Sequence, residues 1–259
     1  MQPAQRRPIW SAFTDMTLGF GFGFPRRWPG ATVWTPAVIQ TALWLDANDT
    51  STITLNGSTV SQWNDKSGNG RNAVQATAAN QPVYGTTNGR VGLAFDGADS
   101  LVCASNIQIV GGLTAFMVSA FRTTTFGFTR QFSQFDGPSA NNRWMISPND
   151  QIYNRFYVDA GGVVSSASIF TPSPVTWDTN PHILGGTYAP SQGVYAYFDG
   201  RSSDFSANNG TPAATNQNPL VIGASANIII NEVIAVASAV SNDDRRRIEG
   251  YLAWKWGGF

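Results

Sequence analysis

The sequence predicts an all-β fold: a two-sheet antiparallel jelly-roll sandwich with one short C-terminal helix and an extended N-terminal arm. Short runs of alternating apolar residues, turn dipeptides between these runs and a single capped helical stripe support this fold class. The chain has 259 residues, of which 42% are hydrophobic, and it contains 26 glycines. All-β sandwiches of this length are often single domains. We therefore expect one domain over 39–259, preceded by an arm over 1–38.

Strand patterns begin near residue 42. Apolar alternation marks the runs 113–121, 155–158, 194–198, 220–222 and 228–236. Turn dipeptides occur at 88–89, 96–97, 199–200 and 209–210. Asp199-Gly200 directly follows an alternating run and indicates a tight hairpin, because both turn positions need positive φ. Many short strands separated by such turns are typical of a sandwich.

One helix is expected at the C-terminal end. Ser241 and Asp244 have the spacing of a capping box, and acidic residues in the first turn complement the helix dipole. A stripe at helical spacing follows and consists of Ile248, Tyr251, Leu252 and Lys255. Gly257-Gly258 ends the pattern. We expect this helix to be a structural element that closes the β domain.

The N-terminal arm differs in composition from the rest of the chain. Gly and Phe alternate over 19–24, so the Phe side chains fall on one side of an extended chain. The segment lacks a polar face and cannot form a core, yet exposed aromatics on this scale would promote aggregation. We expect the arm to bind a partner subunit, although a strap across its own domain is an alternative. The expected contact residues are Arg6, Arg7, Trp10, Phe20, Phe22, Phe24, Arg26, Arg27 and Trp28.

Charge and hydropathy narrow the range of partners. Sixteen basic residues balance sixteen acidic ones, so no global field attracts nucleic acid or anionic lipid. The two arginine doublets beside aromatic residues are compatible with binding of single-stranded nucleic acid. Without a groove they are weak evidence for such a partner. No apolar run is long enough to span a membrane, and no uninterrupted apolar segment follows the N-terminus as a secretory signal requires.

Three stretches carry a resemblance to a known family. They are 43–47 with 60–70 (LWLDA and VSQWNDKSGNG), 93–101 (LAFDGADSL) and 247–257 (RIEGYLAWKWG). They resemble the laminin-G-like branch of the concanavalin A-like lectin/glucanase jelly rolls. The resemblance implies two packed antiparallel sheets with the N- and C-terminal strands adjacent. Such domains occur in bacterial surface proteins and in structural proteins of tailed phages, where they bind glycans or neighbouring subunits.

Catalytic constellations are scarce, and we expect no enzyme activity. Glu232 and Glu249 are the only glutamates and lack the close spacing that glycosidases of this superfamily use. His182 is the sole histidine and is expected to be structural. Cys103 is the sole cysteine, so neither a disulfide nor an ordinary zinc site can form.

The sequence offers candidates for two kinds of binding site, one for calcium and one for a sugar. Asp65, Ser67 and Asn69 alternate as in the start of an EF-hand loop, but Ala76 occupies the position of the bidentate Glu. These residues are calcium candidates, with an Asx-type turn as the alternative; no other cofactor is expected. A sugar site needs an aromatic platform beside polar loop residues. The candidates are Trp144 with Arg143, Trp177, and the tyrosines around Arg155.

These observations lead to two functional hypotheses. The first is a non-catalytic virion structural protein, a capsid decoration or tail-associated subunit, that is attached through the arm and displays the jelly roll. It would be made in the host cytoplasm without a signal peptide and be present as a homo-oligomer or repeated subunit, with other virion proteins as partners. The alternative is a carbohydrate-binding adhesion module of a bacterial surface or receptor-binding protein, with a host-surface glycan as partner.

Overall fold

The computed structural model describes residues 34–122, 129–135, 142–149, 153–170, 180–208, 210–215 and 218–257. The side chains of residues 149 and 170 are not described. The arm residues named above and Trp177 therefore lie outside the described residues, and their expected roles remain predictions.

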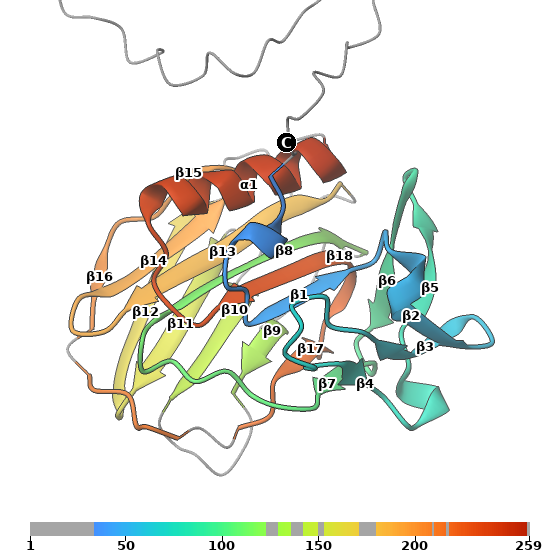
Figure 1. The fold of residues 1–259 in the computed structure, drawn as a ribbon, viewed down its shortest axis with the longest axis horizontal. Helices are drawn as coiled ribbons and strands as arrows, with labels where there is room; N and C mark the ends of the chain where they lie inside the picture. Colours follow the sequence, from blue (N-terminus) through green and yellow to red (C-terminus); the bar gives the residue numbers. More distant parts are fainter. Residues whose placement is uncertain are drawn as a thin grey trace, which may run out of the picture. The chain divides into compact units, whose positions relative to one another are not determined.

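Two antiparallel sheets form the sandwich that the sequence predicts (Figure 1). The first, here called the helix-side sheet, contains β5 (Val83–Thr87), β6 (Arg90–Asp96), β18 (Asn227–Val236), β1 (Leu43–Asp46), β8 (Leu113–Phe121), β13 (His182–Ala189), β14 (Gly193–Phe198), β15 (Arg201–Ser202) and β16 (Ser206–Ala207). The second, the distal sheet, contains β2 (Ile53–Asn56), β3 (Thr59–Trp63), β4 (Ala73–Val74), β7 (Leu101–Cys103), β17 (Val221–Ala224), β9 (Arg130–Gln134), β10 (Arg143–Asn149), β11 (Tyr153–Ala160) and β12 (Val163–Phe170).

The sheets are joined at one edge, where Thr59 of β3 pairs with Val83 of β5. The first and last strands are neighbours, as the family resemblance implies: β1 pairs with β18 in the register Leu43↔Ala235 and Asp46↔Glu232. Short 3-10 turns lie at Pro36–Val38, Thr50–Thr52 and Ala78–Asn80.

Apolar side chains form two separate layers. The larger cluster fills the space between the two sheets, and the smaller one lies between the helix-side sheet and the helix. Strand β8 contributes to both, because Ala115 and Met117 face the sandwich interior while Phe116 and Val118 face the helix. All nine residues of β8 are therefore buried.

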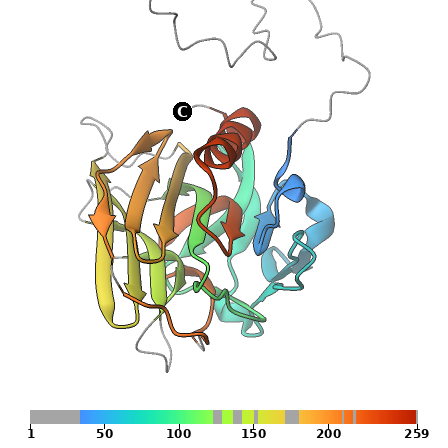
Figure 2. The same cartoon turned by 60° about the vertical axis from the view of Figure 1, so that its left-hand side comes forward.

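Helix α1 (Asn242–Trp256) crosses the outer face of the helix-side sheet (Figure 2). Its predicted cap is confirmed: the Ser241 hydroxyl oxygen accepts the Asp244 N–H at 3.1 Å, and the hydroxyl donates to the Asp244 carboxylate at 2.9 Å. The helix ends at Gly257, whose φ of 58° suits a residue without a Cβ. No helix among the described ranges is long and apolar enough to cross a membrane.

Residues 34–38, which the sequence analysis placed in the arm, are part of the folded unit in the structure. The Trp34 ring lies 6.0 Å from that of Tyr251 in an edge-on arrangement, and Pro36 is buried. Trp34 and Pro36 therefore belong to the folded unit, and an arm over the residues before them remains a prediction. The composition of this segment did not reveal the difference, because an aromatic residue suits an arm and a packed helix surface equally well.

Candidate functional site

A groove with aromatic walls lies where β14 and the segment leading to β16 meet the beginning of α1. Its volume is about 200 Å³. The residues that give it chemical character are Thr187, Gln192, Tyr195, Tyr197, Phe205, Asn242 and Arg245. We call this feature the aromatic groove.

Two exposed rings form one wall of the aromatic groove. Tyr195 is 39% exposed and Phe205 is 49% exposed, and their ring centroids are 5.2 Å apart. Tyr195 also stacks on Tyr197, with centroids 6.4 Å apart and an interplanar angle of 20°. The two tyrosines share a face because alternate residues of a strand point the same way. Tyr195 and Phe205 therefore present an exposed aromatic surface, whereas Tyr197 is buried in the apolar layer under α1.

Gly193 allows Phe205 to lie against the backbone at the edge of this wall. A Cβ at position 193 would come within 2.7 Å of the Phe205 ring and 2.1 Å of the Ser206 carbonyl oxygen. Any larger residue would therefore displace the ring. Because Gly193 has no side chain, the Phe205 ring can lie against its backbone.

The helix supplies the polar wall. The Arg245 guanidinium lies 4.7 Å from the centre of the Tyr197 ring and pairs with Glu249 one turn further along α1. Burial raises the pKa of Glu249 to about 7, although Arg245 and Arg246 counteract the shift. Arg245 Nε and Glu249 Oε1 are buried and make no hydrogen bond within the described part of the chain. Arg245 lines the groove, whereas Glu249 lies behind it and is buried.

This combination matches what sugar recognition requires. An apolar ring face stacks on an aromatic side chain, and a few placed polar groups fix the orientation of the hydroxyls. Asn242 and Gln192 add exposed amide groups at the rim. The geometry can bind a hydroxylated ring.

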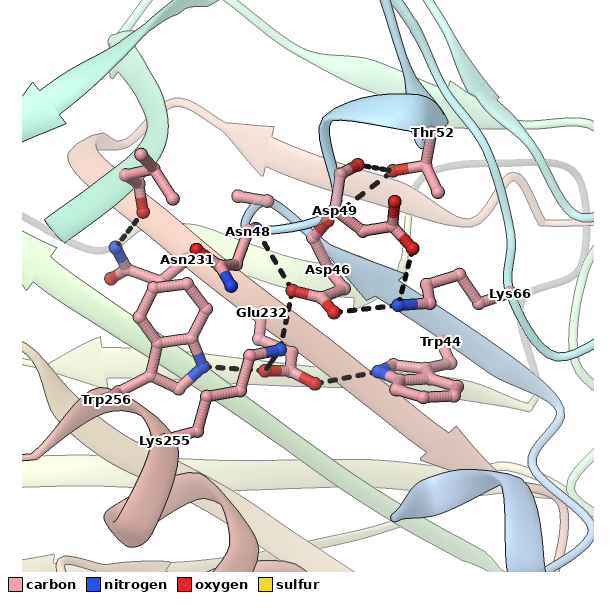
Figure 3. Close-up of polar contacts among 12 residues, drawn as sticks. Trp44, Asp46, Asn48, Asp49, Thr52, Lys66, Asn231, Glu232, Lys255 and Trp256 are labelled. Atoms are coloured by element: carbon pink, nitrogen blue, oxygen red, sulfur yellow. Dashed lines mark hydrogen bonds and ion pairs between the residues drawn. The ribbon is translucent and has the colours of Figure 1, made fainter. Parts of the chain in front are cut away.

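A second polar cluster lies under α1 and serves the fold (Figure 3). Glu232 of β18 is fully buried and its carboxylate accepts four hydrogen bonds. The donors are Trp44 Nε1 at 2.7 Å, the Tyr251 hydroxyl at 3.0 Å, Lys255 Nζ at 2.8 Å and Trp256 Nε1 at 2.6 Å. Burial raises the pKa of Glu232, while the Lys255 ammonium opposes the shift. An ionised carboxylate can only accept hydrogen bonds, so the four donors around Glu232 fit its ionised form.

Asp46 extends this cluster to the other lysine of the chain. Its carboxylate contacts Lys255 at 2.6 Å and Lys66 at 2.9 Å, and Lys66 also pairs with Asp49 at 2.8 Å. The Lys66 ammonium lies 4.4 Å from the centre of the Trp44 ring. The cluster therefore ties β1, β18, α1 and the segment after β3 together with charge-assisted hydrogen bonds.

The calcium candidates lie in the loop after β3, beside a cavity of about 450 Å³. The Asp65 carboxylate accepts the N–H groups of Trp44, Ser67 and Arg71 at 2.9–3.0 Å, and it accepts the Ser67 hydroxyl at 2.7 Å. Asn69 donates its amide to the Thr41 carbonyl at 2.8 Å. These bonds make the Asx-type turn that was the alternative interpretation. Among the described residues no three His, Cys, Asp or Glu side chains gather as a metal site would need. A calcium role for Asp65, Ser67 and Asn69 remains a prediction.

The glycan platform predicted at Trp144 requires a correction. Trp144 is 0% exposed and packs edge-on against Phe132 with ring centroids 4.8 Å apart, so neither ring face is open to a sugar. Arg143 pairs with Asp159 at 2.9 Å. The polar neighbours of Trp144 suggested a loop, but strand alternation turns the indole into the core. Sequence reasoning missed the groove, although the alternation of Tyr195 and Tyr197 was its available signal.

Comparison with known proteins identifies the fold. No protein-family model and no curated protein matches the sequence. The receptor-binding domain of botulinum neurotoxin C/D mosaic serotype has a TM-score of 0.59 at 9% identity, covering 82% of this chain and 51% of that one. The binding domain of Paraclostridial Mosquitocidal Protein 1 has a TM-score of 0.57 at 12% identity, covering 83% and 52%. Trypanosoma rangeli sialidase has a TM-score of 0.55 at 16% identity, covering 89% and 35%.

These similarities show that the chain has the jelly-roll fold of those structures, the fold that the resemblance implied. At these identities the likeness concerns the fold, and function must be argued from the site. The chain spans about half the length of the two binding domains.

Proposed function

We propose that this chain is a non-catalytic binding module that recognises a glycan through the aromatic groove. The observation that carries the proposal is the pair of exposed rings, Tyr195 and Phe205, facing a wall with an arginine and an asparagine. Exposed apolar rings are unfavourable in water when the protein is free, and the apolar face of a sugar would cover them. The 450 Å³ cavity is less suitable, because the side chains of Lys66, Ser67 and Asn69 on its wall are already hydrogen-bonded within the protein.

The comparisons support a binding role. Of the three structures compared above, two are named as binding domains, one of them of a botulinum neurotoxin, and the third is a sialidase. Transfer of a receptor- or glycan-binding role to this chain rests on the groove, since the shared fold hosts several functions.

A glycan array with the full chain tests the proposal. We expect selective signals that weaken in Tyr195→Ala and Phe205→Ala by about 2- to 12-fold each, the loss that one aromatic contact produces. Trp254→Ala is the matched control, because Trp254 is 66% exposed on α1 and does not line the groove. Its binding should equal that of the wild type. An array that stays blank at high protein concentration would sink the proposal.

The composition of residues 1–38 supports a second proposal, attachment to a virion through the arm. A glycine-, proline- and aromatic-rich segment without a polar face needs a surface to cover it. On this proposal the module is displayed on a particle and the groove faces outward to a host glycan. Deletion of 1–33 should abolish particle association and leave glycan binding intact. Retention of the truncated chain on purified particles would refute attachment without touching the first proposal.

A further inference from the structure

The charges around the aromatic groove indicate which glycans it takes, an inference that rests on the proposed function. The cation on its wall, Arg245, already has a carboxylate partner in Glu249. The wall formed by β13, β14 and the segment before β16 contributes hydroxyl, amide and aromatic groups and no charge. An anionic ligand would therefore find no uncompensated positive charge among the lining residues.

The flanking residues do not change this balance. Asp204 precedes Phe205, and Asp243 follows Asn242, so an acid adjoins each of these two lining positions in the chain. Further along the helix, Arg247 pairs with Asp244 at 3.2 Å. Arg246 faces solvent on the same helix. Close to the groove, negative charge is therefore at least as abundant as positive charge, and an anion gains nothing from the local field.

The exposed polar groups of the groove are neutral amides, those of Gln192 and Asn242. An amide both donates and accepts hydrogen bonds, as a sugar hydroxyl does. A carboxylate or sulfate can only accept, so it would use the donor half of each amide alone. The lining therefore suits a neutral hydroxylated ring.

From these observations we propose that the aromatic groove selects uncharged hexose rings and discriminates against glycans in which the bound ring carries a carboxylate or sulfate. The volume of about 200 Å³ lies below the usual range of small-molecule pockets, which fits recognition of a single terminal ring.

The test compares matched probes on the full chain. Neutral oligosaccharides ending in glucose, galactose, mannose or an N-acetylhexosamine are titrated beside the same glycans with one terminal sialic acid or sulfate. We expect the best neutral probe to bind at least about tenfold more tightly than its charged counterpart, a difference of 1.4 kcal/mol. Equal or tighter binding of the charged probes would overturn the inference and leave the proposed function standing. Absence of binding by every probe would overturn both.

A variant of Glu249 tests whether the charge pairing of Arg245, rather than the shape of the groove, sets the preference for neutral glycans. Glu249→Gln leaves Arg245 without its carboxylate, so the preference for neutral probes should shrink or reverse. If this variant does not fold, lowering the pH from 8 to 6 in the wild type should shift the preference in the same direction. The groups that face Glu249 are Arg245 and Arg246 on α1 and Tyr197 on β14, and burial raises the pKa of Tyr197 further above this range. An unchanged preference, in the variant or across this pH range, would contradict the proposed role of the pair.

Discussion

At the scale of single residues, the two glutamates of this chain illustrate how context decides the role of one side chain. Glu232 is buried with four donors around it, including the Lys255 ammonium. Glu249 is buried with one ionic partner and one oxygen that has no hydrogen bond in the described structure. The first environment favours a carboxylate, whereas burial in the second raises the pKa of Glu249 to about 7.

Replacing Glu232 by Gln should destabilise the fold by about 3–5 kcal/mol, the usual cost of breaking a buried ion pair. The new amide would direct N–H groups at an indole or ammonium donor. Urea denaturation followed by tryptophan fluorescence measures the change, because Trp44 and Trp256 both donate to this carboxylate. Loss of less than about 1 kcal/mol would show that the cluster under α1 is not what stabilises the helix contact.

The same substitution at Glu249 should affect the pH dependence of stability. The folded pKa of about 7 lies above the ordinary glutamate value of 4.5, so the folded state holds this proton more tightly than the unfolded chain does. Stability from this group is complete below about pH 4.5 and is lost as the pH rises through 7, by up to about 3 kcal/mol. Urea midpoints at intervals from pH 4.5 to 8 should fall for the wild type and fall less for Glu249→Gln. Parallel profiles would show that Glu249 titrates normally.

At the scale of elements, α1 has a double role: it covers the outer face of the helix-side sheet and supplies the polar wall of the aromatic groove. Its apolar stripe buries Ile248 and Leu252, and its first turn places Asn242 and Arg245 beside the rings of β14. The N-cap therefore anchors the part of the helix that forms the groove.

Loss of the cap gives a prediction at this scale. Ser241→Ala removes the oxygen that accepts the Asp244 N–H and should cost about 1 kcal/mol of stability. Asn242→Ala, one residue further on, removes no hydrogen bond within the described chain and is the stability control. Thermal unfolding of both variants checks this. Equal transition temperatures would mean that the cap contributes nothing to the folded state.

Elements governed by local chemistry were predictable from the sequence. The capped helix and the hairpin at Asp199-Gly200 follow from two or three adjacent residues, and both are present. The groove was not predictable, because Tyr195, Phe205 and Arg245 come from three segments that only the tertiary fold brings together. Trp144 was misjudged for a related reason, since its polar neighbours concealed which face of β10 turns inward. The four partners of Glu232 were hidden in the same way, because each lies at least 19 residues away in the sequence.

At the scale of the whole molecule, the folded unit over 34–259 contains both apolar layers among its described residues. We therefore expect a chain lacking 1–33 to unfold at the same urea midpoint as the full chain, within error. A large fall in the midpoint would show that the N-terminal segment is part of the sandwich, and the arm proposal would then fail.

On the proposed function, this jelly roll binds a sugar in the aromatic groove. The most direct measurement is an NMR titration of the full chain with the strongest neutral glycan from the array, following the aromatic ring protons and the backbone amides. We predict saturable shifts at Tyr195 and Phe205. In Tyr195→Ala the Phe205 shift should need about 2- to 12-fold more ligand to saturate, and in Trp254→Ala both shifts should be unchanged. Shifts confined to residues around Lys66 and Arg71 would place the ligand in the other cavity and contradict the claim.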